Sequence, residues 1–581
     1  MINSIGRGLA APPPAPGSVL VGRPLHRGGV AGGYDAIVVG SGAGGLTSAV
    51  CLAKQGRRVA VFEQHYTAGG YTHAYRRRGW EWDVGIHYVG QLRGREPMRV
   101  LSDYLTDGTL RWASLGDPFD EYRFGSDVFG APVGHRAYRA MLVERFPAER
   151  AGIDELFARI KRCRTALPFL AVRRLSGRIP ERAARLLGRT VPEYALRPAR
   201  EVVCELTADR RLRRAVLSPT AVLMADSTAD LPFLMLAVMF EHFRTGAWYP
   251  VGGSTQIARS MLAPVRRSGG EVFVRAPVAR IEVEAGRAAG VVLADGTLVR
   301  APVVISGAGA RNTFGKLLPE QVAAAHGYPQ LLARARDGYS FVVLFLGLDG
   351  SPAELGLPRN NVLVLEDEDC DTFYRRAPGS RSRLTSGLFI SFASAKDPTW
   401  STRHPGRSTG EVLAYVRPEW FEDAAGTAWN KRGPEYRAVK DAVCEELLAA
   451  LYRHVPQTRG KVVHQELGTP LTAEHFGNWP TGSLYGLAKD RENLLNQDHW
   501  LRPRTRVPGL YLCGQDSLAG GLVGAVGGGL LAAHEALDTA GRIRLWRDLA
   551  VRAARGPAPA PGPAADEPSA RSAASGSTTD R

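Results

Sequence analysis

Residues 34–63, YDAIVVGSGAGGLTSAVCLAKQGRRVAVFE, decide the fold. Five of the first six residues are apolar and three of them are β-branched, which is typical of a buried parallel strand. Gly40, Gly42 and Gly45 follow in G-x-G-x-x-G spacing, and a helix is predicted directly after them. In such a loop the first glycine permits the tight turn, the second lets the backbone approach a pyrophosphate, and the third lets helix and strand pack closely. The stretch therefore predicts a dinucleotide bound at the start of a helix.

The residues that follow this loop indicate which dinucleotide is bound. A second strand, residues 58–62, delivers Glu63 at a position 23 residues after Gly40. A carboxylate at that spacing accepts hydrogen bonds from ribose hydroxyls and disfavours a 2′-phosphate, so the site is not built for NADP. Gly69 and Gly70 give a second close approach of the backbone, which suits a longer cofactor that continues past the pyrophosphate. FAD is therefore expected rather than NAD.

Three separate blocks of the sequence resemble one flavoprotein family, which contains retinol saturases, phytoene desaturases and carotenoid isomerases. Residues 63–70 and residues 82–90 (WDVGIHYVG) are similar to the amino-terminal flavin region of that family. Residues 249–306 resemble the block that returns to the FAD domain, and residues 508–529 resemble the carboxy-terminal flavin motif, a strand followed by a glycine-opened helix. The blocks occur in the order that the family has.

The resemblance implies how the cofactor is held. Val278 would meet the adenine through its backbone, Asp516 would bind a ribityl hydroxyl, and N–H groups near Val523 and Gly524 would face the pyrimidine edge of the flavin. At that edge the positive end of a helix stabilises a reduced, anionic flavin. With the amino-terminal loops included, the expected FAD-binding residues are Gly40, Gly42, Ala43, Gly44, Gly45, Glu63, Gln64, Gly69, Gly70, Val278, Gly514, Asp516, Val523 and Gly524.

One position departs from the family pattern. Many relatives carry Arg directly after the second glycine pair, whereas this sequence has Tyr71. A phosphate contact normally made by a guanidinium is then absent or supplied from elsewhere. Arg76, Arg77 and Arg78 lie near in sequence and are either that source or a solvated basic turn.

The length and the position of these blocks predict the domain organisation. With 581 residues, the chain exceeds one ordinary domain. The expected fold class is α/β: a Rossmann-type FAD-binding domain with a doubly wound parallel sheet, interleaved with an α+β substrate domain. The FAD-binding domain takes residues 34–99, 249–310 and 501–545, and the substrate domain takes residues 100–248 and 311–500. Residues 1–33 are expected to be a disordered extension, and residues 546–581 the end of the last helix and a disordered tail.

The composition restricts the class of partner. The net charge of +17 is carried mostly by Arg beside abundant Ala, Gly and Pro, as a composition bias acting on the whole chain would produce. No zinc spacing or recognition-helix pattern accompanies it, so no nucleic-acid partner is expected. The six cysteines form no C-x-x-C pair or framework spacing, which suits a reducing cytoplasm and indicates no metal site.

Two segments of the sequence indicate whether the protein spans or contacts a membrane. The longest apolar run, residues 231–240, is about half of what a membrane-spanning helix needs. Residues 159–189 hold ten Lys or Arg against one acid, interleaved with apolar residues. This pattern is compatible with peripheral contact with an anionic membrane surface, and the alternative is an exposed helical pair. The expected location is therefore the cytoplasm, with or without such contact.

The chemistry of a flavin restricts the reactions that this protein can catalyse. Flavin N5 exchanges a hydride with carbon, and saturation of a C=C bond needs a proton at the second carbon. Candidate donors are His87, Tyr88, Tyr249 and Tyr485, of which histidine has the best-matched pKa. For each of them a structural hydrogen-bonding role is the alternative.

These features favour an FAD-dependent oxidoreductase that acts by hydride transfer on the C=C bonds of a conjugated polyene or isoprenoid, a hydrophobic small molecule. Saturation, desaturation and isomerisation stay open, as does the electron donor or acceptor. The alternatives are a reductase or reductive cyclase of a polyketide-derived polyene in bacterial secondary metabolism, a flavin amine oxidase, and a non-enzymatic prenyl-binding protein of the GDP-dissociation-inhibitor type. A prenyl-binding protein that does not use a flavin has no reason to keep the cofactor-binding residues together, namely Gly40, Gly42, Gly45, Glu63, Gly514 and Asp516.

Overall fold

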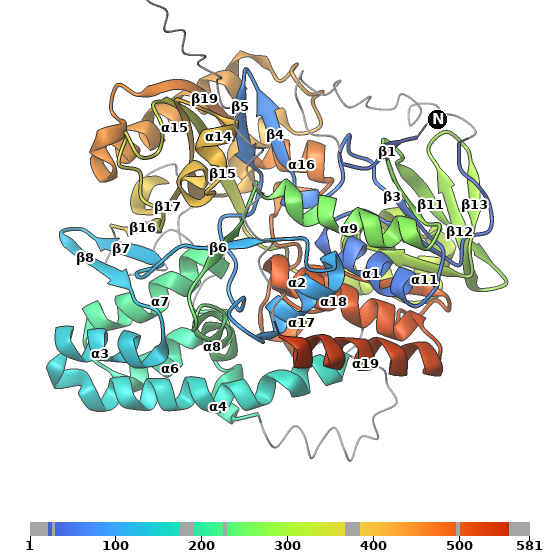
Figure 1. Ribbon diagram of the computed structural model, residues 1–581, viewed down its shortest axis with the longest axis horizontal. Coiled ribbons are helices and arrows are strands. Elements are labelled where there is room, and N and C mark those ends of the chain that lie inside the picture. The colour runs from blue at the N-terminus through green and yellow to red at the C-terminus, as the bar shows by residue number, and fades with distance from the viewer. Residues whose placement is uncertain are drawn as a thin grey trace, which may run out of the picture.

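The protein has two lobes, each built around one large sheet. The computed structural model describes residues 21–25, 29–174, 191–224, 229–366, 384–495 and 500–556. Figure 1 shows one lobe on the right, with α1, α9 and the hairpin strands β11 to β13. The other lobe lies on the left, with strands β15 to β19 above and the helices α3 to α8 below.

The right-hand lobe contains a parallel sheet of six strands. Its strands come from distant parts of the sequence, in the spatial order β1 (Arg23–Pro24), β10 (Glu271–Val274), β3 (Val59–Phe62), β2 (Ala36–Val39), β14 (Val303–Ser306) and β20 (Leu510–Leu512). An antiparallel three-stranded sheet lies beside it: β11 (Val278–Glu284), β12 (Arg287–Leu293) and β13 (Leu298–Arg300).

Both faces of the parallel sheet are buried, which explains why its strands read as continuous apolar runs. In β2, Ala36 and Val38 pack on the side of α1, and Ile37 and Val39 pack on the side of the three-stranded sheet. The helices of the first side are α1 (Ala43–Lys54), α2 (Pro97–Thr106), α9 (Thr255–Arg267), α18 (Gly521–Ala536) and α19 (Thr539–Arg555). The short helices of the other side are α10 (Ala310–Asn312), α11 (Glu320–Ala325) and α12 (Tyr328–Arg334). The predicted α/β fold with a parallel sheet is confirmed.

The left-hand lobe contains a mixed sheet of seven strands, in which every pair of neighbours is antiparallel except β16 and β7, which are parallel. Its order is β19 (Val462–Gly468), β15 (Ser340–Asp349), β18 (Arg407–Val416), β17 (Gly387–Ser391), β16 (Asn361–Leu365), β7 (Asp120–Phe124) and β8 (Asp127–Ala131). The helices of this lobe are α3 (His135–Arg145), α4 (Arg150–Arg174), α6 (Ala199–Leu206), α7 (Arg210–Met224), α8 (Phe233–His242), α13 (Ala393–Lys396), α14 (Trp400–Arg403), α15 (Gly433–His454), α16 (Pro470–Gly477) and α17 (Arg491–Leu495).

Alternation along the central strands divides this sheet into two faces. In β15, Val342 and Leu344 belong to the apolar cluster that includes α15. Phe341 belongs to the cluster on the opposite face, which includes residues of α4 and α8. Because side chains alternate along a strand, one face packs on α15 and the other is free to wall an internal space.

Two short antiparallel strand pairs connect the lobes. The hairpin of β4 (Ala74–Arg77) and β5 (Trp80–Asp83) comes from the amino-terminal flavin block but packs against the seven-stranded sheet. There the Trp82 indole N–H donates to the carbonyl of Leu346 at 2.8 Å. The second pairing joins β6 (Trp112–Ser114) to β9 (Trp248–Pro250) and runs between the lobes in Figure 1.

The expected disorder of residues 1–33 is wrong for residues 21–25. Strand β1 extends the parallel sheet beyond β10, and Val21 is buried. The Ala68 N–H donates to the Val21 carbonyl at 2.8 Å, and the Leu25 N–H donates to the Val274 carbonyl at 3.0 Å. The sequence pattern missed this strand because it is two residues long and its pairing partner lies about 250 residues away. Residues 1–20 and 557–581 lie outside the described residues.

Candidate active site

One cavity of about 1020 Å³ lies between the two lobes and collects nearly all the predicted site residues. Its walls fall into two compartments. The first is made of glycine loops and helix starts of the parallel-sheet lobe, and the second of apolar side chains from the seven-stranded sheet and α8.

The β2–α1 loop forms the centre of the glycine compartment. Gly40 has a φ of 89°, and a Cβ on Gly45 would lie 2.1 Å from the Gly40 carbonyl oxygen. These two glycines are therefore required by the turn and by the packing of α1. A Cβ on Gly42, by contrast, would meet no atom within 4 Å, and Gly42 lines the cavity. The amino end of α1 has no side-chain cap, so its free N–H groups can receive a phosphate.

Glu63 lines this compartment at the end of β3 and organises the loop beside it. Its Oε2 accepts hydrogen bonds from the Ser41 N–H at 2.8 Å and the Ser41 hydroxyl at 2.7 Å. Its Oε1 accepts the His65 N–H at 2.9 Å. A carboxylate has about four acceptor positions, so three bonds to the protein leave capacity for a ribose hydroxyl.

The two glycines of the second pair, Gly69 and Gly70, have different roles. Gly70 lines the cavity, and a Cβ there would lie 2.9 Å from the Gly42 Cα, so the two loops touch. Gly69 does not line the cavity, and its N–H donates to the Ser41 hydroxyl at 3.1 Å. Gly69 therefore lies behind the lining, where it supports Ser41 and, through the Ser41 hydroxyl, Glu63.

The carboxy-terminal block completes the compartment. Asp516 is buried, and its carboxylate accepts the N–H groups of Ala310 at 2.9 Å and Leu487 at 3.0 Å. The start of α18, which contains Val523 and Gly524, has no side-chain cap and lines the cavity as well. Two uncapped helix starts thus face one space. A Cβ on Gly44 would lie 2.6 Å from the Gly514 Cα, which makes this glycine a packing requirement between α1 and the carboxy-terminal block.

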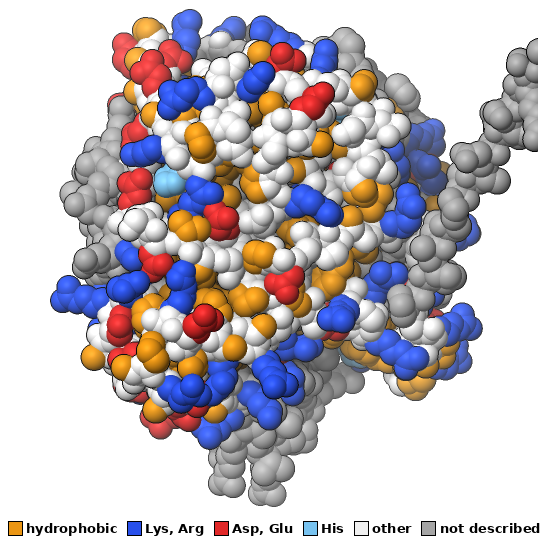
Figure 2. Space-filling model, turned by 60° about the vertical axis from the view of Figure 1, so that its left-hand side comes forward, with side chains coloured by type: hydrophobic (Ala, Val, Ile, Leu, Met, Phe, Trp, Pro, Cys, Tyr) orange, Lys and Arg blue, Asp and Glu red, His pale blue; other side chains and the backbone are white. Residues whose placement is uncertain are grey.

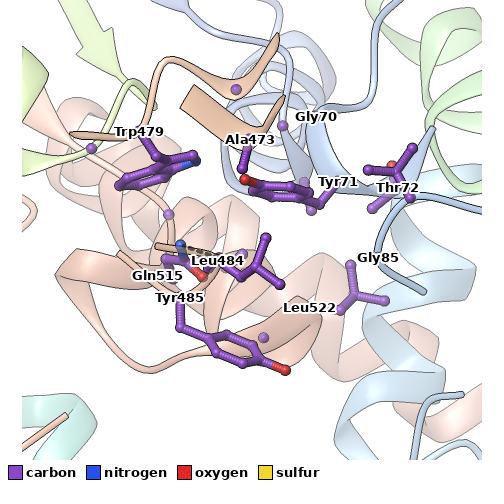
Figure 3. Close-up of a pocket in the computed structure, with 18 of the residues that line it drawn as sticks. Gly70, Tyr71, Thr72, Gly85, Ala473, Trp479, Leu484, Tyr485, Gln515 and Leu522 are labelled. Atoms are coloured by element: carbon purple, nitrogen blue, oxygen red, sulfur yellow. Dashed lines mark hydrogen bonds between the residues drawn. The ribbon is translucent and has the colours of Figure 1, made fainter. Parts of the chain in front are cut away.

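Of the other predicted cofactor residues, Ala43, Gln64, Val278 and Gly514 also line the cavity. Tyr71, which replaces the usual Arg, lines it too, and its buried hydroxyl has no hydrogen-bond partner among the described residues. Figure 3 shows Tyr71 and Trp479 along the upper side of the pocket and Tyr485 across from them. The dashed line in this view is the hydrogen bond from Gln515 Nε2 to the Leu484 carbonyl, at 3.2 Å.

The neighbouring arginines have carboxylate partners. Arg76 and Arg77 lie on β4 and line the cavity. Arg76 pairs with Glu81 at 2.5 Å, and Arg77 pairs with Glu466. Each of these two guanidinium groups is therefore already engaged by a carboxylate.

The second compartment is apolar and aromatic. Its walls are the side chains that alternate onto the inner face of the sheet, together with α8. Those that line the cavity are Phe341, Val343 and Phe345 of β15, Phe389 of β17, Leu413 and Tyr415 of β18, and Met235, Val238 and Met239 of α8. A long hydrophobic molecule could be enclosed here next to the glycine loops.

The four predicted proton donors lie in different surroundings. His87 and Tyr88 line the apolar compartment, as does Tyr485, where burial raises the pKa of its hydroxyl to about 12. Tyr88 donates to Asp120 at 2.9 Å. Tyr249 is buried outside the cavity lining and donates to Asp83, so its hydroxyl is committed to that carboxylate.

The sequence patterns missed the charged residues beneath His87. Asp83, Asp120, Lys396 and Glu411 are all buried, and none was a predicted site residue. Burial raises the pKa of Asp83 to about 7 and that of Asp120 to about 7. A usable signal existed, since Glu411 interrupts an otherwise uncharged strand from residue 408 to residue 416. Charged groups are almost never fully buried unless they are paired.

The fold and the site define the class: a flavoprotein oxidoreductase with FAD as its cofactor. The sequence profile of the family described as flavin containing amine oxidoreductase matches residues 43–537. All-trans-retinol 13,14-reductase of Danio rerio is 35% identical over 537 residues, which cover 89% of this chain and 87% of that protein. A chloroplastic prolycopene isomerase of Daucus carota is 25% identical over 523 residues, covering 86% of this chain and 79% of that protein.

Solved structures agree on the fold. An oxidoreductase from Methanosarcina mazei superimposes with a TM-score of 0.57 at 17% identity, over 86% of this chain and 99% of that chain. The chain belongs to the flavin-containing amine oxidoreductase family, and the resemblance to retinol saturases and carotenoid isomerases is confirmed.

Proposed function

We propose that this oxidoreductase exchanges a hydride with a C=C bond of a conjugated polyene or isoprenoid. The observation that carries the proposal is the continuity of the cavity, in which an apolar, aromatic compartment opens directly onto the glycine loops. The names of the relatives support it, because retinol and prolycopene are both conjugated isoprenoids. The likeness to amine oxidases lies in the shared family fold and favours no amine substrate.

The cofactor is held by main-chain groups and two carboxylates in this proposal. The amino ends of α1 and α18 would take the pyrophosphate and the pyrimidine edge, and Glu63 and Asp516 the ribose and ribityl hydroxyls. Val278 and Gln64, which line the same compartment, would contact the adenine end. Bound FAD supplies hydride exchange with carbon.

The apolar compartment has two tasks in the reaction. Its aromatic walls would align an extended chain by contacts that need no polar group on the substrate. They would also exclude water from the reacting carbon, so that a proton reaches it only from a side chain that lines the space. His87 is the proposed donor, because it combines a place in this wall with an exchangeable proton.

Anaerobic incubation with candidate substrates tests the proposal. The purified holoenzyme, oxidised in one series and reduced with dithionite in the other, is mixed with all-trans-retinol and with a poly-cis carotene. Mass spectrometry and chromatography should find a product that gains two hydrogens, loses two or is an isomer. Oxidation of a primary amine with no change in either polyene would overturn the proposal. The control is the Gly42→Ala variant, in which the cofactor loop is blocked.

We also propose peripheral contact with an anionic membrane surface through α4. Lys161, Arg162 and Arg164 are exposed on this helix. Lys and Arg side chains gather toward the lower edge of the face in Figure 2, the edge along which α4 runs in Figure 1. Arg159 pairs with Glu155 and Glu205, and Arg162 pairs with Glu155, so these two contribute less. The rest of the basic segment, residues 175–189, lies outside the described residues. No helix in the described ranges combines the length and apolar character needed to cross a bilayer.

Sedimentation with vesicles tests this contact. Binding to phosphatidylserine-containing vesicles should exceed binding to phosphatidylcholine vesicles and fall as salt is added. The double variant Lys161→Glu, Arg164→Glu should bind more weakly, whereas Arg280→Glu, on β11 of the other lobe, should bind like the wild type. Equal binding to both kinds of vesicle would contradict the proposal.

A further inference from the structure

A buried carboxylate stands next to His87 behind the wall of the apolar compartment. Glu411 lies in β18, where alternate side chains share one face, so it is on the same face as Leu413 and Tyr415, which line the cavity. Glu411 Oε2 lies 3.1 Å from His87 Nδ1, and the Glu411 side chain is 2% exposed. The other oxygen, Oε1, is buried and has no hydrogen-bond partner in the described part of the chain. His87 is thus the link between this carboxyl group and the cavity.

A buried lysine supplies charge to the same cluster. Lys396, at the end of α13, is 1% exposed, and its Nζ donates to the His87 carbonyl at 2.9 Å and to the Ser391 hydroxyl at 2.7 Å. Its third partner is the Asn361 side-chain oxygen. Ser391 lies directly opposite Glu411 in the pairing of β17 with β18. Burial lowers the pKa of Lys396 to about 8, so near neutral pH the ammonium group is charged; its partners are neutral oxygens, and its charge is available to stabilise a nearby carboxylate.

Burial determines which of the two groups carries a proton. It raises the pKa of Glu411 to about 8, against the lowering effect of Lys396. Burial and the Lys396 charge lower the pKa of His87 to about 3. Near neutral pH the pair is therefore a protonated carboxyl group and a neutral imidazole. The carboxyl O–H then donates to Nδ1, and the imidazole proton is on Nε2.

We propose that Glu411 acts through His87 to deliver the proton that the polyene needs, with Lys396 stabilising the carboxylate that remains. The inference rests on the proposed function. In the reducing direction reduced FAD would supply a hydride, which forms a C–H bond at one carbon as the C=C π bond breaks. The second carbon takes the proton from His87 Nε2, Nδ1 takes the proton from Glu411, and the imidazole stays neutral. In the oxidising direction the same protons move in reverse.

The other candidates are less suited to this task. The Tyr88 hydroxyl donates to Asp120, and the Tyr249 hydroxyl donates to Asp83. The pKa of Tyr485, about 12, lies much further from neutral pH than that of Glu411. Five further ionisable groups face the Glu411–Lys396 cluster: Tyr75 on β4, Asp83 on β5, Tyr88, Asp120 on β7 and Tyr249 on β9. Burial raises the pKa of each of the three tyrosines well above its usual value, so only the two aspartates titrate in the same pH range as Glu411.

The pH dependence of the holoenzyme tests the relay. The step needs protonated Glu411, so reduction by the wild type should slow as pH rises through about 8. In Glu411→Gln the amide keeps the size of the side chain but has no proton to give up. Reduction at pH 7 should be slower by about 10²–10⁴, and the decline near pH 8 should disappear. Glu411→Asp should recover part of the rate and a titration in this range.

Glu121→Gln is the matched control, because Glu121 lies in β7 of the same sheet, half-buried and paired with Arg123 outside the cavity. Its rate and pH profile should equal those of the wild type. A Glu411→Gln enzyme with a rate within threefold of the wild type and the same pH profile would overturn the proposal.

Infrared difference spectroscopy supplies a readout that does not depend on turnover. Between pH 6 and pH 10, the wild-type holoenzyme should lose the C=O bands of protonated carboxyl groups, among them those of Asp83 and Asp120, and the component that belongs to Glu411 should be missing in Glu411→Gln. Absence of that component from the wild type would refute the relay, even if a Gln variant failed to fold. If the band is present and no polyene is converted, the proposed function fails while the protonated Glu411 stands.

Discussion

The two compartments of the cavity are built in opposite ways. The glycine compartment is made largely of main-chain groups from two local motifs, the β2–α1 loop and the carboxy-terminal block, each of which carries its own strand, loop and helix start. The apolar compartment and the polar cluster behind it are made of side chains that strands β5, β7, β15, β17 and β18 bring together from positions up to about 330 residues apart. A main-chain site depends on where glycine is placed. A side-chain site depends on which strands become neighbours.

This contrast predicts different responses to mutation. Changes in the apolar compartment should alter the rate and leave the cofactor bound. Changes at Glu63 and Gly42 in the glycine compartment should weaken cofactor binding and leave the rest of the fold intact.

The largest effect is expected at His87. His87→Ala removes the group that links Glu411 to the cavity, and product formation should slow by about 10²–10⁴, while FAD still binds and is still reduced by dithionite. Stopped-flow absorbance measures product formation and the reduction of FAD by dithionite separately. Tyr88→Phe, which removes a neighbouring hydroxyl in the same wall, should cost only a few-fold. Turnover of His87→Ala within a few-fold of the wild type would remove this residue from the reaction.

A smaller effect, on binding alone, is expected at Glu63. Glu63→Ala removes a carboxylate that accepts three hydrogen bonds from the loop as well as the proposed ribose contact. One charge-assisted bond contributes roughly 1.5–3 kcal/mol, so the FAD dissociation constant should rise by about 10- to 100-fold. Glu63→Gln should lose less. The flavin-to-protein absorbance ratio after gel filtration measures retention, with Glu284→Ala on the exposed edge of β11 as control. Wild-type occupancy in Glu63→Ala would show that the acid does not support the cofactor.

Substitution of Gly42 tests whether cofactor binding can be weakened without a loss of stability. Its φ of −59° suits any residue, and a Cβ there would meet no protein atom within 4 Å. Gly42→Ala should therefore keep the melting temperature of the cofactor-free protein and bind FAD about tenfold more weakly or worse, because the added methyl group occupies the space of the pyrophosphate. Calorimetry of the cofactor-free protein and fluorescence titration with FAD measure the two quantities. Equal FAD affinity would place the pyrophosphate elsewhere.

The smallest effect concerns the edge of the parallel sheet. Deletion of residues 1–25 removes β1 and the buried Val21, whose burial contributes roughly 1.5–3 kcal/mol, so the melting temperature should fall by a few degrees. Deletion of residues 1–20, or of residues 557–581, both rich in Pro and small residues, should leave it unchanged. An equal melting temperature for the 1–20 and 1–25 deletions would mean that β1 adds no stability.

Local signals made the first lobe predictable. The strand, glycine loop and helix of residues 34–63 lie next to one another, so spacing alone predicts which glycine turns the chain and which one faces a ligand. Gly42 and Gly45 illustrate this, since one is open to the cavity and the other is closed by the Gly40 carbonyl. Gly69 is an exception, because the reach of its N–H to Ser41 depends on how two loops dock.

For the second lobe, the sequence predicted only the fold class, an α+β substrate domain. His87 was identified from its place after a strand, but Glu411 was not, although the two side chains are in contact. No local pattern relates a residue at position 87 to one at position 411.

The sequence by itself therefore determined the fold class, the cofactor and the loops that bind a dinucleotide, because each depends on backbone conformation encoded by neighbouring residues. The tertiary structure alone decided that β1 joins the sheet, that Tyr249 is committed to Asp83, and that Glu411 and Lys396 lie behind His87. These outcomes depend on strand pairing and burial over hundreds of residues. Burial also sets the pKa values of those groups, and a residue's environment exists only once the chain has folded.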